Sequence, residues 1–185
     1  MKEHRFTVQK FREVESTNTL AKEYAKNGSP DGLVIVADYQ TAGRGKPGRT
    51  WVSPAGKDLL FSLLLRPPIP PHKAPLLTQI FCRSVAKVLK SKFRIQSTFK
   101  RPNDVLVDGK KICGVLVECV SNGNCHVESI IAGIGLNVNS DIPNLLPTAT
   151  SIKAIGGKKA GRSELLKSLL RQIQSDLKGI YAHPA

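Results

Sequence analysis

A chain of 185 residues with 41% hydrophobic residues is long and apolar enough to bury one substantial core, which excludes a disordered protein. No apolar run approaches the roughly 20 residues that span a membrane, and the amino terminus leads into no signal core, so we expect a soluble, cytoplasmic protein. The net charge of +14 favours anionic ligands or acidic partners, but 5% aromatic residues and no helix-turn-helix or zinc-finger spacing argue against a nucleic-acid-binding module.

The first part of the chain predicts a strand, a helix and a second strand. Apolar and charged residues mix over positions 6–14, which predicts the first strand. Positions 16–18 hold good N-cap residues, and apolar residues then recur at helical spacing until Asn27-Gly28 ends the helix. A β-branched run begins the second strand, which we expect over residues 33–40.

A glycine-rich basic loop follows the second strand. Residues 41–51, TAGRGKPGRTW, place three glycines and three cations within seven positions and end on the only tryptophan, Trp51. Glycine lets a backbone approach a ligand closely because no Cβ intervenes. Arg44, Lys46 and Arg49 add positive charge, so the pattern is typical of a site for phosphate or another anion. A solvated turn with incidental charge is the alternative.

The rest of the chain predicts a buried strand, two helices and a meander. Residues 59–65 are almost continuously apolar, which is typical of a strand buried on both faces. An apolar stripe predicts a helix over Pro75–Phe93, and Ser163 caps a closing helix with apolar residues as far as Leu177. Tight turns at 108–109 and 121–124 join three strands into an antiparallel meander: residues 105–107, 112–120 and 126–139.

The four cysteines, Cys82, Cys113, Cys119 and Cys125, show no pair at the two-residue spacing of a zinc site. Two of them lie in an apolar strand-like run, where a thiol usually acts as a small buried hydrophobe. We therefore expect all four to be reduced and structural.

Six segments occur in order along the chain: Ser16-Thr17-Asn18, Tyr39-Gln40-Thr41-Ala42-Gly43-Arg44-Gly45, Gly48-Arg49-Thr50-Trp51, Lys100-x-Pro102-Asn103-Asp104, Lys111-Ile112-x-Gly114-x-Leu116-Val117-Glu118 and Gly133-Ile134-Gly135-Leu136-Asn137. Together they closely resemble the catalytic domain of biotin protein ligases. One glycine loop would be weak evidence, whereas several motifs in order at fitting separations are strong. The resemblance implies an α/β (α+β) domain similar to class II aminoacyl-tRNA synthetases, with a mixed, mostly antiparallel sheet and helices packed on one side.

The resemblance also implies two chemical steps. The biotin carboxylate attacks the α-phosphate of ATP, giving biotinyl-5′-AMP and pyrophosphate. A lysine of a biotin carboxyl carrier protein, part of acetyl-CoA carboxylase or another biotin-dependent carboxylase, then attacks the mixed anhydride and releases AMP. Because two anions must meet in the first step, cations and Mg²⁺ must neutralise the developing charge.

The resemblance assigns roles to matching residues. Those that bind biotin are Ser16, Thr17, Asn18, Gln40, Gly43, Arg44, Lys111, Gly114 and Gly133. Those that bind ATP or the adenylate are Lys46, Arg49, Trp51, Asn103 and Asn137. Lys111, Arg44 and Lys46 are catalytic, and Asp104 and Asn137 offer oxygens to Mg²⁺. Ordinary roles remain open: helix capping for residues 16–18, a solvated turn lysine for Lys111, a turn cap for Asn103-Asp104 and a core anchor for Trp51.

Three features depart from the family pattern. Lys46 stands where the family usually has arginine, so charge is kept but the bidentate fork is lost and adenylate retention is expected to be weaker. Arg101 replaces a usual tryptophan. We expect a single catalytic domain over residues 1–185, with the family's small SH3-like C-terminal domain absent or truncated. We also expect no N-terminal DNA-binding domain, which argues against a repressor role.

Two other functions are kept as alternatives. A lipoate or octanoate ligase shares a related fold, and a basic nucleic-acid-binding module would explain the charge. The edge of the meander is a candidate for pairing with a second copy of the chain or with the carrier, so a homodimer is left open.

Overall fold

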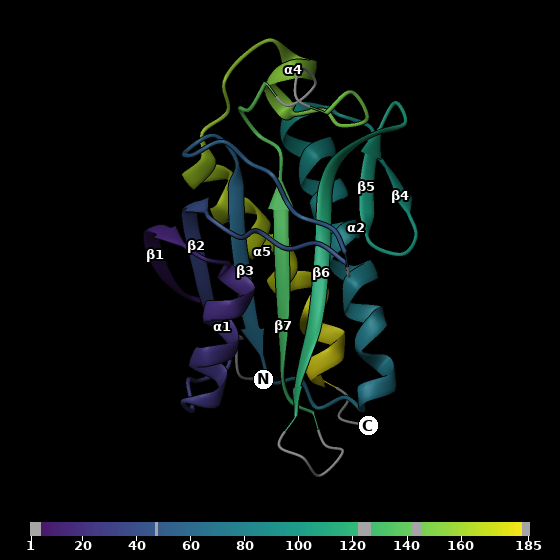
Figure 1. The fold of residues 1–185 in the computed structure, drawn as a ribbon. Helices are drawn as coiled ribbons and strands as arrows, with labels where there is room; N and C mark the ends of the chain where they lie inside the picture. Colours follow the sequence, from purple (N-terminus) through teal and green to yellow (C-terminus); the bar gives the residue numbers. More distant parts are fainter. Residues whose placement is uncertain (1–4, 47, 122–126, 142–145, 183–185) are drawn as a thin grey trace.

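The computed structural model describes residues 5–46, 48–121, 127–141 and 146–182. Its centre is one seven-stranded sheet with the order β1-β2-β3-β7-β6-β5-β4 (Figure 1). The strands are β1 (Thr7–Val14), β2 (Leu33–Gln40), β3 (Leu59–Leu65), β4 (Thr98–Lys100), β5 (Asp104–Val107), β6 (Lys110–Ser121) and β7 (Val127–Leu136). The helices are α1 (Thr17–Lys26), α2 (Ala74–Phe93), α4 (Ile152–Gly156) and α5 (Arg162–Ala182), with a 3₁₀ turn η1 (Pro71–Lys73) before α2.

The sheet is mixed because one pair of neighbours runs parallel. β1 and β2 are parallel and are joined by the crossover helix α1, as parallel neighbours require. Every other neighbouring pair of the described strands is antiparallel. The mixed, mostly antiparallel sheet inferred from the sequence is therefore confirmed.

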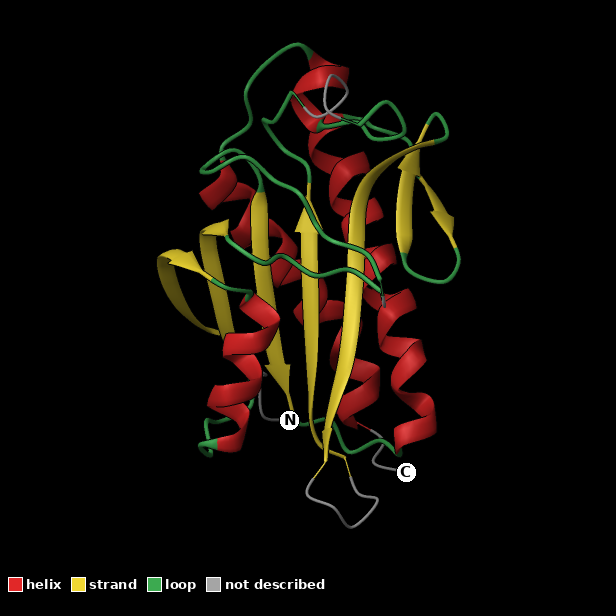
Figure 2. Ribbon diagram, viewed as in Figure 1, coloured by secondary structure: helices red, strands yellow, loops and turns green. Residues whose placement is uncertain are grey.

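Side chains that alternate along the central strands pack into two separate hydrophobic cores. In β3, Leu63 and Leu65 pack with α2 and α5, whereas Leu64 packs with α1. Because successive strand residues point to opposite faces, the two cores lie on opposite sides of the sheet. The expectation of helices on one side holds for α2 and α5, but α1 lies on the opposite face (Figure 2).

The predicted meander is formed by β5, β6 and β7. Its turn at Asp108-Gly109 is present, with both residues at positive φ, whereas the turn expected at 121–124 falls mostly outside the described residues. β6 and β7 pair so that Gly114 faces Gly135 and Leu116 faces Gly133. This register gathers three glycines on the central two strands.

One short strand and the state of the cysteines complete the fold. The short edge strand β4 was not predicted, because it has only three residues. Cys82, Cys113 and Cys119 are free thiols; Cys82 and Cys113 are buried as expected, whereas Cys119 is exposed, and Cys125 lies outside the described residues. Burial raises the pKa of the Cys82 thiol to about 12, with the Asp104 charge adding to the effect, which fits a structural role.

Within the described ranges, no helix is long and apolar enough to cross a bilayer.

Candidate active site

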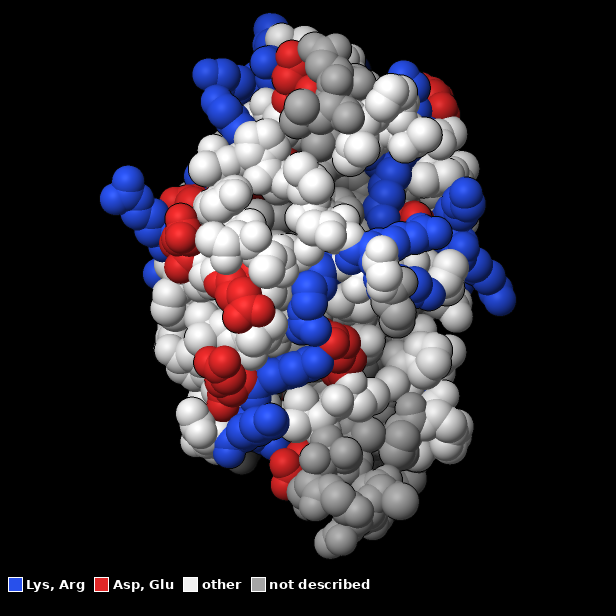
Figure 3. Space-filling view, viewed as in Figure 1, with Lys and Arg blue, Asp and Glu red and all other residues white. Residues whose placement is uncertain are grey.

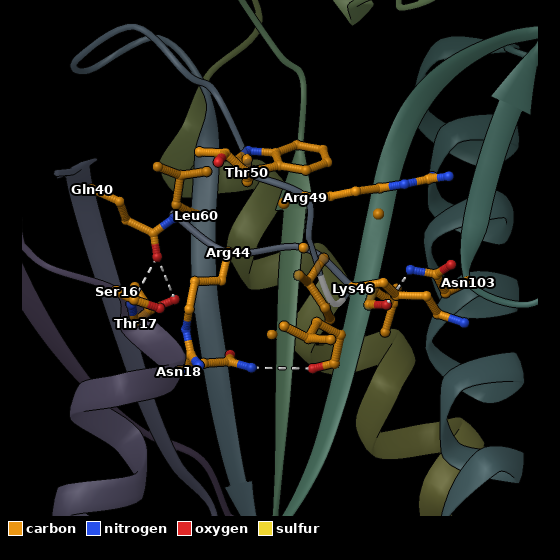
Figure 4. A pocket seen from close by; sticks show the side chains of 18 of the residues that line it. Ser16, Thr17, Asn18, Gln40, Arg44, Lys46, Arg49, Thr50, Leu60 and Asn103 are labelled. Carbon is orange, nitrogen blue, oxygen red and sulfur yellow. Dashed lines mark hydrogen bonds between the residues drawn. The ribbon is translucent and has the colours of Figure 1, made fainter. Parts of the chain in front are cut away.

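A pocket opens on the α1 face of the sheet (Figure 4), where the basic loop crosses β7 and β6 (Figure 1). It brings together all but two of the predicted site residues: Ser16, Thr17, Asn18, Gln40, Arg44, Lys46, Arg49, Trp51, Asn103, Asp104, Lys111, Gly114 and Gly133. Gly43 and Asn137 do not line it. Residues far apart in sequence therefore meet, as the motif order implied.

The basic loop is a hairpin laid across the sheet rather than a solvated turn. The Trp51 N–H donates to the Gly43 carbonyl at 2.9 Å, and the Gly45 N–H donates to the Arg49 carbonyl at 2.8 Å. A bridge between Arg44 and Thr50 links the same two arms. A Cβ on Gly43 would lie 2.5 Å from the Trp51 carbonyl oxygen, so this glycine acts by letting the arms close.

Gln40, at the end of β2, caps helix α1. Its Oε1 accepts the Thr17 N–H at 2.7 Å and lies 3.0 Å from the Thr17 hydroxyl. Ser16 occupies the N-cap position, but its side chain makes no capping hydrogen bond. The capping alternative is therefore wrong for the Ser16 hydroxyl, which lies in the pocket wall instead.

A buried hydroxyl beneath the pocket fixes the first turn of α1. Ser62 of β3 is fully buried, and its Oγ lies 2.7 Å from Thr17 Oγ1 and 2.6 Å from Asn18 Oδ1. Because Asn18 Oδ1 can only accept, Ser62 donates to it. The Asn18 amide sits directly over Gly133, where any Cβ would collide with it. In this structure Gly133 thus makes room for Asn18.

Glu118 of β6 joins helix α1 to the basic loop. Its carboxylate accepts from Asn18 Nδ2 at 2.7 Å and from Lys22 Nζ at 2.6 Å, and Arg44 lies 3.4 Å away. Burial alone would raise the pKa of the Glu118 carboxyl, but the hydrogen bonds and charges of these partners outweigh burial and hold the pKa below 4.5. Glu118 is therefore a charged junction that positions Asn18 and Arg44.

Trp51 lies flat on two glycines of neighbouring strands. A Cβ on Gly114 would lie 2.9 Å from the indole, and a Cβ on Gly135 would lie 2.5 Å from it. Lys111 Nζ is 5.3 Å from the ring centroid, within cation–π range. Trp51 therefore anchors the hairpin on the sheet, as the alternative interpretation of this residue predicts. Its Nε1 is buried and has no hydrogen-bond partner among the described residues.

Lys111 is held in place by both its side chain and its backbone. Its Nζ pairs with Asp104 at 2.7 Å, which excludes the alternative of a freely solvated turn lysine. Its N–H donates to the Thr148 carbonyl at 2.9 Å, and its carbonyl accepts the Thr150 N–H at 2.8 Å. Asn137 Nδ2 also donates to the Thr150 carbonyl, at 2.9 Å. Asn137 therefore supports the segment that flanks Lys111.

The acidic groups of the pocket suit at most a metal ion that arrives with a substrate. Among the described residues, no three His, Cys, Asp or Glu side chains gather in one group. Asp104 supplies one carboxylate to the pocket, and Asn137 lies outside it. Mg²⁺ commonly binds one or two carboxylates together with substrate phosphates, so Asp104 fits such an ion.

Asn103 and three unpredicted residues complete the site. The Asn103 side-chain amide donates to the Val115 carbonyl at 2.9 Å, and the Asn103 main-chain carbonyl accepts the Val115 N–H at 3.0 Å. Sequence reasoning assigned no role to Ser62, Glu118 or Gly135. Glu118 and Gly135 belong to quoted motifs, so their motif positions were a usable signal, whereas Ser62 lies in an apolar run that gives none.

Comparisons with known proteins agree with this geometry. A sequence profile of the Biotin/lipoate A/B protein ligase family matches residues 11–137. The chain is 40% identical over 161 residues to the bifunctional ligase/repressor BirA of Bacillus subtilis, covering 85% of this chain and 49% of that protein. It is 30% identical over 165 residues to the biotin–[acetyl-CoA-carboxylase] ligase of Mycobacterium tuberculosis, covering 86% and 60%. This chain therefore spans about half of the first relative's length.

A solved structure shares the whole fold. The biotin protein ligase of Aquifex aeolicus in complex with biotin and ATP superposes with a TM-score of 0.82 at 35% identity. The match covers 95% of this chain and 72% of that one.

Replacing Gly135 by alanine tests the support of Trp51. The new Cβ would lie 2.5 Å from the indole, so we expect the ring to be displaced and the free energy of unfolding to fall by about 1–3 kcal/mol. Because Trp51 is the only tryptophan, its fluorescence emission should shift. Gly179→Ala in α5, where nothing lies within 4 Å, is the control. An unchanged spectrum and stability in Gly135→Ala would contradict this account.

Replacing Glu118 by glutamine tests the charged junction. We expect a loss of about 1 kcal/mol in the free energy of unfolding near pH 7, because the pairs with Lys22 and Arg44 disappear. The folded-state pKa of Glu118 is lowered, so its contribution is complete above 4.5 and is lost as the pH falls through the folded value. Urea unfolding should therefore show the difference shrinking below pH 4.5. A constant difference, or an equal effect from exposed Glu23→Gln, would contradict it.

Proposed function

Because this chain belongs to the biotin/lipoate A/B protein ligase family, we propose that it activates biotin with ATP and transfers the biotinyl group to a lysine of a carrier protein. The relative from Mycobacterium tuberculosis is named for acetyl-CoA carboxylase. The carrier proposed for this chain is therefore the biotin carboxyl carrier protein or domain of that enzyme, or of another biotin-dependent carboxylase.

The observation that carries the proposal is the division of the pocket into a neutral end and a cationic end. Ser16, Thr17 and Gln40 offer uncharged donors and acceptors at one end, as Figure 4 shows. Lys46 and Arg49 lie toward the other. Biotin has a neutral ureido ring at one end and a carboxylate at the other, so this division matches its two ends and leaves the phosphates beside the cations.

Lys111 is the proposed catalytic residue for adenylate formation. Asp104 holds its ammonium group in the pocket at 2.7 Å, and the ammonium group can attract a carboxylate and a phosphate together. Arg44 and Lys46 add positive charge from the hairpin. Asp104 would hold an Mg²⁺ ion that arrives with ATP, and this ion would supply further neutralisation of the negative charge.

The basic hairpin is proposed to retain the adenylate until the carrier arrives. A mixed anhydride hydrolyses in water, so the site gains from a covering element. The hairpin already lies across the pocket, where its Arg44 contacts Glu118. The carrier lysine then attacks the acyl carbon, and AMP leaves.

A lipoate or octanoate ligase is the second candidate, since the family includes both kinds of enzyme. The neutral polar cluster at Ser16, Thr17 and Gln40 favours biotin, because a dithiolane or alkyl chain has no group to pair with it. ATP–pyrophosphate exchange measured with biotin and with lipoate separates the two. Exchange with lipoate alone would reverse the assignment.

Substitution of Lys111 tests the proposed mechanism. We expect Lys111→Ala to lower biotin-dependent ATP–pyrophosphate exchange by at least about a hundredfold, because the charge shared by the two anions is lost. Circular dichroism should show that the fold is retained. Lys110→Ala, the exposed neighbour, is the matched control and should keep its activity. Near-normal exchange in Lys111→Ala would remove this lysine from the mechanism.

Substitution of Lys46 tests retention. We expect Lys46→Gly to form the adenylate but to release it into solution, because the hairpin loses one of its charges toward the phosphates. Rapid gel filtration after the reaction, followed by chromatography of the free fraction, measures the leak. Tighter retention than in the unaltered protein would contradict the covering role.

A further inference from the structure

We propose that a second cavity, the carrier pocket, receives an acidic segment of the carrier protein, and that Arg101 selects it. The proposal rests on the function proposed above. The carrier pocket lies between α2, the β4–β5 connection and the outer edge of β6. Its walls include Pro75 and Gln79 of α2, Phe99 and Arg101 from the β4 side, and Val117 of β6.

The carrier pocket adjoins the active-site pocket. Lys46, Asn103, Val115 and Leu116 line both. A group bound in the second cavity therefore lies next to the place where the acyl-adenylate forms. The function proposed above assigns biotin and the nucleotide to the first pocket, and the reactant it has not yet placed is the lysine-bearing segment of the carrier.

Two cationic side chains without an ion-pair partner among the described residues line the second cavity. Arg101 is exposed, and neither Arg101 nor Lys46 forms an ion pair with any described residue. No acidic side chain lines this cavity. Figure 3 shows Lys and Arg side chains gathered across the middle of this face. An acidic side chain on the partner would find Arg101 there, and such complementarity guides docking and orientation.

The remaining lining favours a polypeptide over a free phosphate. Pro75, Phe99 and Val117 contribute apolar surface, which a hydrated anion would not select. The edge of β6 adds a second reason. β5 pairs with β6 only along Lys110–Gly114, and no described strand covers the rest of that edge.

The backbone direction of that edge suits an extended segment. The Val115 N–H and carbonyl both point to the β5 side, where they bond Asn103. Because the pattern repeats every second residue, Val117 and Cys119 turn their backbone groups the same way, along the carrier pocket. Open strand edges accept extended chains, so the occupant that fits is an extended segment with an acidic residue beside the target lysine.

The test compares the two half-reactions in charge-reversal variants. The substrate is the biotin carboxyl carrier domain from the source organism's own acetyl-CoA carboxylase. We expect Arg101→Glu to raise the KM for this domain by about tenfold or more, with steeper loss at low salt, and to leave biotin-dependent ATP–pyrophosphate exchange unchanged. Arg101→Lys should retain most of the affinity. Gln79→Glu, in the opposite wall, should also raise the KM.

Arg83→Glu makes the same change in net charge on an exposed part of α2 that does not line the cavity, and should have little effect. An unchanged KM for the carrier domain in Arg101→Glu, or an equal rise in Arg83→Glu, would overturn the proposal. So would a raised KM for pyrophosphate with normal transfer, since the cavity would then serve the leaving group. Absence of exchange in the unaltered protein would instead refute the proposed function itself.

Discussion

The site depends on three positions where the sheet has no side chain. Gly114, Gly133 and Gly135 lie on two neighbouring strands, and each is covered closely by another residue. Trp51 rests on two of them and Asn18 on the third. A side chain at any of these positions would lift the hairpin or the start of α1 off the sheet. Close backbone approach is therefore the constraint from which the pocket follows.

Polar contacts then convert this close packing into an ordered site. Ser62 and Gln40 hold the first turn of α1, and Glu118 connects that turn to Arg44 of the hairpin. Buried polar groups are costly unless they are paired, so this network favours one arrangement of the loop and helix. Ser16 and Lys111 line the pocket, and Ser62 and Glu118 do not line it and only support it, whereas Gln40 does both.

Much of this arrangement was predictable because it is encoded locally or by motif order. The apolar run at 59–65 and the turn at 108–109 carry direct signals, and the structure has the corresponding strand and hairpin. The opposite placement of α1 and the burial of Ser62 depend on which strands become neighbours, which periodicity does not reveal. Asn137 shows the same limit, because its motif indicated the site but not that its amide would face the Thr150 backbone.

The backbone around Lys111 has a further consequence. Lys111 lies opposite Leu106 of β5 on one side, and on the other side its N–H and carbonyl bond Thr148 and Thr150; helix α4 begins at Ile152, two residues beyond Thr150. The Lys111 backbone is therefore linked through residues 148–150 to α4, whose last three residues are exposed. A displacement of α4 would therefore move residues 148–150 and the Lys111 backbone that they hold.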